Sequence, residues 1–443
     1  MLEAGGPTQV QHADFHFVPL LDGLGPEISQ HLTSVCVSVR RDFLCLFRDL
    51  IDKLNSNRTS EGAEDASPPV TCIVSDGFMT FSIRVAEELG IPVAMFFTIS
   101  ACAFMGILQY RDLKDRGIVP LKDHLFICDF HILFHVENSY ITNGYLNTTL
   151  DWIPGMKDIQ LKDLPTFLRT TDPDDILFNI IMESADNAPR ATTTILHTFD
   201  VLETEILRAV SPLFSSIHAI GPLQLLLDHK APADPLRAVD YNPWNEDTEC
   251  LKWLDSKETG TVIYVNFGSI AVLTLEQLIE IGMGLAMSKY HFLWVIRPNL
   301  VVGESASLPP EFAAKTEGRG FITSWCPQER VLNHPSVGGF LTHCGWNSIM
   351  ESIVAGVPMI CWPFLGDQQT NCRFCCREWG IGMEINEDVN RVEVVKLVKE
   401  LMEGGEGRIM KERVMEWKQL AREAVGPDGS SAMNFDKLLH ILS

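Results

Sequence analysis

The sequence predicts an α/β protein that is built from two domains. Short apolar segments alternate with amphipathic stretches of helical periodicity, as they do in folds with parallel sheets. This alternation starts near residue 71, stops around residues 223–247 and starts again near residue 262. The chain has 443 residues, which is long enough for two domains of about 200 residues each. We therefore expect one α/β domain in each half.

The first half begins with an irregular stretch that is rich in glycine and proline, residues 1–30. A helix is expected over residues 29–54, because apolar side chains recur there three or four positions apart. A polar loop follows. The elements expected after it are, in order, strand 71–74, helix 78–89, strand 92–97, helix 100–114, helix 174–187, strand 193–199, a helix capped by Asp200 that ends at Val210, and strand 217–220.

The second half follows a predicted linker. Residues 223–247 lack clear periodicity and contain three prolines. Residues 274–277 (TLEQ) predict a capping box at the start of a helix. Strands are expected over 262–267, 292–297, 321–325, 338–343 and 359–362, and helices from 346 and over 392–402, 411–424 and 432–442. The expected division is a first domain over 1–223, a linker over 224–247, a second domain over 248–425 and a last helix within 426–443.

Charge and composition exclude several classes of partner. The chain has 35 basic and 58 acidic side chains, a net charge of −23, which argues against nucleic acid and anionic membranes. No apolar run reaches the roughly 18 residues that span a bilayer, and no signal peptide is apparent. The 12 cysteines show no disulfide-framework spacing, as in proteins of a reducing cytosol. We expect a cytoplasmic monomer.

The densest group of cysteines is Cys372, Cys375 and Cys376. They lie in an apolar helical stretch with no second pair of ligands nearby in the sequence. Zinc sites in proteins usually combine two such pairs. We therefore expect thiols packed in the core at these positions, and no metal site.

The stretch from Trp325 to Gln368 carries the strongest functional pattern. An apolar strand over 338–343 breaks at Cys344 and Gly345 and continues as a helix. The first N–H groups of a helix lack partners inside it, and the helix dipole favours negative charge there, so this turn suits a phosphate. Polar side chains beside the turn are those of His343, Asn347 and Ser348.

Other side chains of this stretch suit the remainder of a nucleotide sugar. Glu351 lies one helical turn beyond Ser348, where a carboxylate can accept both hydroxyls of a ribose. Trp325 offers a flat face for a base, while Asp367 and Gln368 follow the next strand and can bind sugar hydroxyls. A single tryptophan or histidine is more often a core residue. Polar groups at the ends of three successive strands favour a binding site.

Two further positions lie at predicted strand ends. Gly268 and Ser269 end a strand of the second half, where a backbone N–H and a hydroxyl can reach a phosphate. Asp76 follows the apolar strand that begins at Thr71. Open α/β sheets place their sites at the carboxyl ends of strands, but an aspartate there is equally an ordinary helix cap. Both interpretations of Asp76 remain open.

The stretch from Trp325 to Gln368 resembles the signature segment of plant secondary-metabolite UDP-glycosyltransferases in its WCPQ start, HCGWNS centre, GVP and DQ end. The resemblance covers about residues 14–443. It implies a GT-B fold, in which two Rossmann-like domains face a cleft and the last helix packs back on the first domain. It also implies transfer of glucose from UDP-glucose to a hydroxyl of a small plant metabolite with inversion, without a metal or cofactor. Gln368 is similar to the residue of glucose-using members.

The resemblance also implies roles for individual residues. In the family pattern Trp325 stacks on uracil, Cys326 supplies backbone contacts, Gln328 and Glu351 bind the ribose, His343, Asn347 and Ser348 hold the diphosphate, and Trp346, Asp367 and Gln368 contact the sugar. Asp76 would orient a catalytic histidine, the general base that deprotonates the acceptor hydroxyl. The helix terminus and His343 would stabilise the leaving phosphate.

The sequence departs from the family pattern in its first domain. Relatives begin with a strand, a Gly-His loop and a helix, whereas this chain starts in what resembles the region after their second strand. His12, His16 and His31 do not lie in a Gly-His context, so the general-base histidine is missing. Residues 124–136 form an apolar insert. We therefore expect a shortened chain whose first domain lacks its opening strand and helix.

Three functions remain open at this stage. The first is an active UDP-glucose-dependent glucosyltransferase, whose acceptor would be a flavonoid, terpenoid, cyanohydrin or hormone-like alcohol. The second is a catalytically inactive UDP-sugar binder that lacks the general base. The third, a dinucleotide-dependent oxidoreductase, is disfavoured, because the partial glycine motif at Gly282-Met283-Gly284 lies inside a predicted helix and does not follow a strand.

Overall fold

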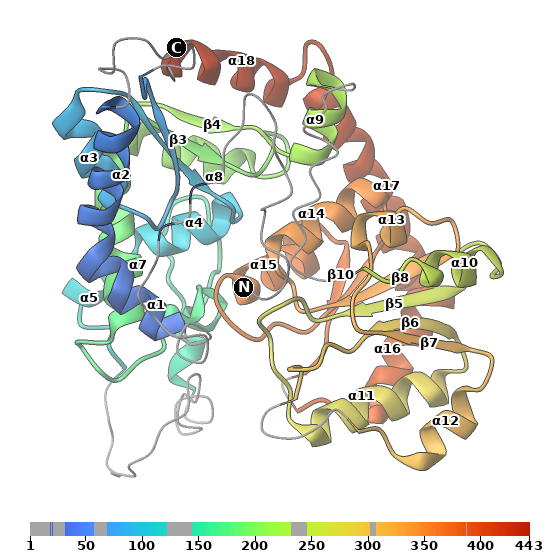
Figure 1. Cartoon of the computed structure of the whole chain (residues 1–443). Coiled ribbons are helices and arrows are strands. Elements are labelled where there is room, and N and C mark those ends of the chain that lie inside the picture. Colours follow the sequence, from blue (N-terminus) through green and yellow to red (C-terminus); the bar gives the residue numbers. More distant parts are fainter. Residues whose placement is uncertain are drawn as a thin grey trace. The chain divides into compact units, whose positions relative to one another are not determined.

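The computed structural model describes residues 18, 20, 32–56, 69–121, 144–231, 246–301, 307–386 and 388–443. The chain divides into two compact units, Met1–Pro243 with Ala424–Ser443, and Trp244–Glu423. In the described residues each unit holds one sheet whose paired strands are all parallel, with four strands in the first and six in the second (Figure 1). The α/β class predicted for both halves is confirmed.

The first sheet has the order β1-β2-β3-β4. Its strands are β1 (Ile73–Asp76), β2 (Val93–Phe97), β3 (Thr193–Leu196) and β4 (Ile217–Ala219). The helices of this unit are α1 (Leu32–Ser38), which continues through a π-helical turn (Val39–Phe43) into α2 (Leu44–Ser56), α3 (Phe81–Leu89), α4 (Ala101–Leu108), α5 (Tyr110–Asp115), α7 (Ile176–Asn187), α8 (Thr204–Val210), α9 (Leu223–Lys230) and α18 (Ser430–Leu442). β1 forms one edge of the described sheet, and Val74 on this strand is 57% exposed.

Two details of the first unit differ from the sequence-based expectation. Asp200 does not cap a helix, because α8 begins only at Thr204. The buried carboxylate of Glu203 accepts hydrogen bonds from the N–H groups of Ala101 (2.9 Å) and Cys102 (2.8 Å), at the start of α4. A charged acceptor is favourable there because the first N–H groups of a helix lack partners inside it.

The segment expected to be an irregular linker begins with helix α9. Leu226 of α9 is 4% exposed and joins a buried cluster with Ala432 and Leu438 of α18. The three prolines on which the linker prediction rested all follow the helix, at positions outside the described residues. The apolar side of α9 is therefore used in the core of the first unit, and the short helix was not apparent from periodicity.

The second sheet has the order β10-β9-β8-β5-β6-β7. Its strands are β5 (Val262–Asn266), β6 (His291–Val295), β7 (Gly320–Thr323), β8 (Val337–Thr342), β9 (Met359–Cys361) and β10 (Gly382–Glu384). The helices are α10 (Glu249–Asp255), α11 (Leu275–Ser288), α12 (Pro310–Thr316), α13 (Gln328–Leu332), α14 (Trp346–Ala355), α15 (Gln368–Arg373), a π-helical turn (Phe374–Glu378), α16 (Arg391–Glu403) and α17 (Gly405–Val425). The predicted capping box of Thr274 and Gln277 is confirmed at the start of α11.

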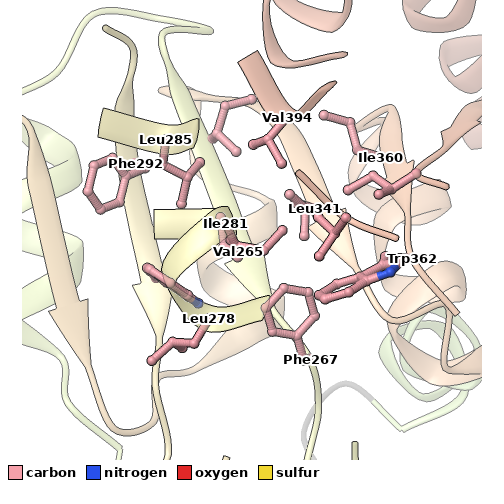
Figure 2. Packing of buried hydrophobic residues seen from close by; sticks show 14 of the residues in the cluster. Val265, Phe267, Leu278, Ile281, Leu285, Phe292, Leu341, Ile360, Trp362 and Val394 are labelled. Carbon is pink, nitrogen blue, oxygen red and sulfur yellow. The ribbon is translucent and has the colours of Figure 1, made fainter. Parts of the chain in front are cut away.

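The core of the second unit lies between this sheet and its helices (Figure 2). Val265 of β5 and Leu341 of β8 are fully buried, as expected for central strands of a parallel sheet. α11 and α16 pack closely together, because a Cβ at Gly284 would lie 2.5 Å from Cβ of Val394. None of the helices in the described part of the chain is both long and apolar enough to cross a bilayer.

Strand order reverses in the second sheet between β5 and β8. From β5 the sheet grows in one direction through β6 and β7, and from β8 it grows in the other direction through β9 and β10. In open α/β sheets, the loops that follow such a pair of strands leave the sheet on opposite sides and open a crevice at its carboxyl end. Ligands of open α/β sheets bind at such a reversal point.

Candidate functional site

The imidazole of His343 occupies the reversal point between two glycines. A Cβ at Gly268, after β5, would lie 2.5 Å from Nε2 of His343, and a Cβ at Gly345, after β8, would lie 2.4 Å from the same atom. Gly268 also has a φ of 68°, a left-handed conformation that side chains disfavour. Both glycines are therefore required for the ring to pack against the backbone of the two loops.

His343 is held in its neutral form. Burial lowers the pKa of His343 to about 4. The nearby positive charge of Arg297 also lowers this pKa, whereas the backbone of Asn266 raises it. Its buried Nδ1 has no hydrogen-bond partner in the described part of the chain that meets distance and angle criteria. A neutral imidazole is still a hydrogen-bond donor, so this ring can bind a phosphate oxygen without carrying a charge.

Arg297 fixes the loop after β5 and was not identified from the sequence. It is 4% exposed, and its guanidinium donates to the backbone carbonyls of Gly268 (Nε, 3.0 Å), Asn299 (Nη1, 2.7 Å) and Ala271 (Nη2). No carboxylate among the described residues forms an ion pair with it. A single arginine after a strand has no diagnostic pattern, so only the fold reveals this buried charge.

Gln328 joins three elements around a carboxylate. Its Oε1 accepts hydrogen bonds from Tyr264 Oη (3.0 Å) and Asn266 Nδ2 (2.7 Å), both on β5. Its Nε2 donates to Ser348 Oγ (2.9 Å) and Glu351 Oε2 (2.7 Å), both on α14. The structure thus brings together the predicted residues Gln328, Ser348 and Glu351. Tyr264 and Asn266 are additional members that the sequence pattern did not indicate.

Asn266 connects this network to the loop after β5. Its Oδ1 accepts a hydrogen bond from the N–H of Gly268 at 2.9 Å, while its Nδ2 serves Gln328. Ser269, the next residue, is exposed. Ser269 is therefore accessible to solvent, and its contact with a phosphate stays a prediction.

The carboxyl group of Glu351 has a pKa near neutral pH. It is only partly exposed, and burial raises the pKa of Glu351 to about 7, opposed by the hydrogen bond from Gln328 and assisted by the negative charge of Glu329. Two charge states are therefore accessible to this side chain under ordinary conditions.

We expect the substitution Glu351→Gln to stabilise the protein at pH 8.5 and to change little at pH 4. Because the pKa of Glu351 is raised to about 7 in the folded state, the carboxyl is protonated in both the folded and the unfolded chain at pH 4, and its cost to folding develops as the pH rises from the lower pKa of the unfolded chain to about 7. Thermal unfolding at both pH values measures the difference. The exposed Glu412→Gln is the control and should show no such pH dependence. Equal shifts at both pH values would contradict the assignment.

Asp367 and Gln368 lie at the start of α15. Asp367 Oδ2 accepts a hydrogen bond from Asn371 Nδ2 (2.8 Å), which also donates to the carbonyl of Cys344 (3.1 Å). Burial raises the pKa of Asp367 to about 6, against the effect of the Asn371 hydrogen bond. Gln368 is 6% exposed, and its Oε1 accepts from the N–H groups of the two loop residues Phe364 (2.8 Å) and Leu365 (3.0 Å). Gln368 therefore also orders its own loop.

The remaining residues predicted for the donor site differ in their exposure to solvent. Trp325 is partly exposed and Asn347 is exposed, as a ligand contact requires. Cys326 and Trp346 are each 3% exposed, and the Trp346 ring packs 5.8 Å from that of Trp379. The side chain of Trp346 belongs to the core, so a sugar contact at this position has to come from its backbone.

Asp76 belongs to the first unit. Its Oδ1 accepts a hydrogen bond from the N–H of Phe78 at 2.9 Å, in a turn that precedes helix α3. Because α3 begins only at Phe81, with Thr80 as its N-cap, Asp76 is not the helix cap that was one of its two interpretations. The residue is exposed at the surface, yet partial burial of the carboxyl raises the pKa of Asp76. His12, His16, His31 and the predicted insert at 124–136 lie outside the described residues, and the orienting role of Asp76 stays a prediction.

Behind the candidate donor site, the Sγ atoms of Cys344, Cys361 and Cys372 all lie within 4.8 Å of one another. Only Cys372 belongs to the cysteine group seen in the sequence. Cys344 comes from the turn before α14 and has a left-handed φ of 64°. Among the described residues, these three thiols form a group that is close enough together to hold a metal ion.

Comparisons with known proteins agree with this geometry. Residues 174–425 match a family model described as UDP-glucoronosyl and UDP-glucosyl transferase. The chain is 49% identical over 432 residues to 7-deoxyloganetin glucosyltransferase of Catharanthus roseus, covering 97% of this chain and 85% of the relative. It is 47% identical over 444 residues to (R)-mandelonitrile beta-glucosyltransferase of Prunus dulcis, covering 99% and 88%. The solved structure of Phytolacca americana UGT2, complexed with UDP-2fluoro-glucose and pterostilbene, is similar with a TM-score of 0.72 and 27% identity, covering 92% and 81%.

Proposed function

The chain belongs to the UDP-glucoronosyl and UDP-glucosyl transferase family, and on this premise we propose that it transfers glucose from UDP-glucose to a hydroxyl of a small plant metabolite, with inversion at the anomeric carbon. The observation that carries the proposal is the cluster at the reversal point of the second sheet. There the network of Gln328, Ser348 and Glu351 adjoins the loop of Gly268 and the neutral His343.

In this proposal the second unit binds UDP-glucose along the crevice. The uracil stacks on Trp325, and the ribose hydroxyls donate to Glu351. The diphosphate lies at the amino end of α14, where backbone N–H groups and the helix dipole favour negative charge. His343 and Ser269 donate to the same oxygens. The glucose hydroxyls bind Asp367 and the amide of Gln368.

The reaction requires little covalent chemistry from the protein. A general base removes the proton of the acceptor hydroxyl, whose oxygen attacks the anomeric carbon from the face opposite the phosphate. The bond from this carbon to the phosphate oxygen breaks, and UDP leaves with the electron pair. The amino end of α14 and His343 stabilise the charge that develops on the leaving diphosphate. We propose that the two units form the GT-B arrangement, in which the first unit supplies the acceptor site.

The acceptor is proposed to be a small alcohol of the terpenoid or cyanohydrin type. The relatives named for 7-deoxyloganetin and (R)-mandelonitrile share nearly half of their residues with this chain over almost its whole length. Both relatives are named for glucosyl transfer to a small molecule. The hydroxyl of a small alcohol needs a base and a shaped pocket, without a charged anchor.

A second candidate function is UDP-sugar binding without transfer. It is favoured by one observation, since no imidazole among the described residues hydrogen-bonds to Asp76, whose recorded partner is the N–H of Phe78. In this alternative the second unit binds the donor, and the general base of the reaction is absent.

The test is UDP-glucose turnover by the purified chain with mandelonitrile, an iridoid aglycone and a panel of phenols, together with calorimetric titration of UDP. UDP binding with acceptor-dependent release of UDP supports the transferase. UDP binding without release, on every acceptor of the panel, supports the binding protein. A folded chain that does not bind UDP rejects both functions.

The role of Asp76 is tested with two matched variants, Asp76→Ala and Asp175→Ala. Asp175 caps α7 through the N–H of Phe178 (2.9 Å), whereas Asp76 accepts from the N–H of Phe78 (2.9 Å) in a turn before α3. We expect each variant to lose about 1 kcal/mol of unfolding free energy with its hydrogen bond to a backbone N–H. If Asp76 orients the base, only Asp76→Ala also lowers kcat, by about 100-fold or more, while the Kd for UDP stays unchanged. Equal kcat values for the two variants would limit Asp76 to a structural role in its turn.

A further inference from the structure

Four cysteines from separate parts of the second unit converge behind the donor crevice. Cys344 lies in the turn between β8 and α14, Cys361 ends β9, and Cys372 lies on α15. Their Sγ atoms are all within 4.8 Å of one another, and Cys376 Sγ lies 4.0 Å from that of Cys372. The first three residues are at most 1% exposed.

The spacing of these sulfur atoms is close to that of a metal–thiolate centre. A tetrahedral zinc ion binds thiolates at about 2.3 Å, which places neighbouring sulfurs about 3.8 Å apart. The pair Cys372 and Cys376, at 4.0 Å, already fits this spacing. The three pairs among Cys344, Cys361 and Cys372, at no more than 4.8 Å, need to approach by at most about 1 Å, which rotation of the side chains can supply.

We propose that Cys344, Cys361, Cys372 and Cys376 bind one thiophilic metal ion of the Zn²⁺ type, which ties together the turn before α14, the end of β9 and the start of α15. The proposal does not depend on the proposed transferase activity. Spacing in the sequence does not indicate this set of four ligands, because Cys344 and Cys361 are remote in the chain from Cys372 and Cys376.

The surroundings of the four thiols suit such an ion. Cys376 is partly exposed, so that an ion can reach the buried sulfurs through it. Binding displaces four thiol protons and leaves a net charge of −2 on the tetrathiolate. Arg373 and Arg377, next to Cys372 and Cys376 in the chain, offset part of this charge. The π-helical turn at Phe374–Glu378 widens the helix at this point, a distortion that is frequent at functional sites.

The test begins with the reduced, chelator-treated full chain. After incubation with Zn²⁺ and removal of excess metal, we expect one zinc per chain by elemental analysis. X-ray absorption at the zinc edge should give a shell of sulfur atoms near about 2.3 Å. A shell of nitrogen or oxygen near about 2.0 Å, or no retained zinc, would overturn the proposal. This measurement uses the unaltered chain and does not depend on the folding of any variant.

Variants then assign the ligands. Cys361→Ser and Cys372→Ser should lose the zinc, and with it the zinc-dependent rise in unfolding temperature. Cys102→Ser, which alters a fully buried thiol of the first unit, and Cys250→Ser, which alters a thiol of the second unit beside Cys326, should retain both. Circular dichroism without metal checks that each variant is folded. Retention of stoichiometric zinc by folded Cys361→Ser would reject this ligand set.

Discussion

Replacing Gly268 with alanine is expected to weaken UDP binding by about tenfold or more, which corresponds to at least ~1.4 kcal/mol. The new Cβ would lie 2.5 Å from Nε2 of His343, so the imidazole has to leave its place between the two glycines. The same substitution places a side chain at a φ of 68°, which costs about 1 kcal/mol of unfolding free energy. Calorimetric titration of UDP and thermal unfolding measure the two effects separately.

Gly260 provides the control for this prediction. It lies before β5, at the opposite end of the strand from Gly268, and has nearly the same φ of 70°. A Cβ at Gly260 meets no atom within 4 Å, so Gly260→Ala carries the backbone strain without the clash. We expect both variants to lose the stability that the strained backbone costs and Gly268→Ala to lose more because of the clash, while only Gly268→Ala loses UDP affinity. Equal UDP affinities would show that the position of His343 does not matter for the diphosphate.

Replacing Arg297 with methionine is expected to lower both stability and UDP affinity. Loss of the guanidinium removes the donor of three backbone carbonyls, a buried one at Ala271 and partly buried ones at Gly268 and Asn299. A buried group that is left unsatisfied costs about 1–3 kcal/mol, and removal of an unpaired buried charge offsets part of this, so we expect a net loss of about 1–2 kcal/mol. The loop that presents Ser269 to the diphosphate loses its anchor, and a positive charge disappears from the crevice.

Uridine separates the effect on the diphosphate from general damage to the site. Uridine retains the base and the ribose, so its affinity should be unchanged in Arg297→Met while that of UDP falls at least about tenfold. Arg319→Met is the matched control. Arg319 also donates to backbone carbonyls, those of Tyr290 (3.1 Å) and Ala286 (3.0 Å), but it lies at the amino end of the sheet, away from the candidate site. Arg319→Met should lose stability and keep its UDP affinity. Parallel losses for UDP and uridine in Arg297→Met would contradict a role in binding the diphosphate.

The local order of the second sheet was predictable because glycine and proline mark its turns. Gly345 precedes α14 at the break that the sequence predicted, and Gly356 ends the helix with a φ of 72°. Helical spacing likewise puts Ser348 and Glu351 on one face of α14, and both contact Gln328. These features depend on neighbours in the chain, so periodicity and turn chemistry reveal them.

Contacts between distant loops were not predictable in this way. Arg297 reaches back 29 residues to the carbonyl of Gly268, and Cys344 meets Cys372 only because β9 brings α15 next to the turn before α14. The orientation of Trp346 is another example, since its indole turns into the core although the residue begins the helix of the candidate site. Such features require the register of the whole sheet.

The membership of α18 in the first unit affects how the protein can fold during its synthesis. Ala432 and Leu438 complete a buried cluster whose other members include Ala94 and Ile195 of the first sheet. The ribosome has to add about 190 further residues after Pro243 before these side chains exist, which takes roughly 10–40 seconds at usual rates of translation. During that interval the apolar face of the first sheet lacks its cover. The nascent chain therefore presents a binding surface for chaperones until α18 emerges.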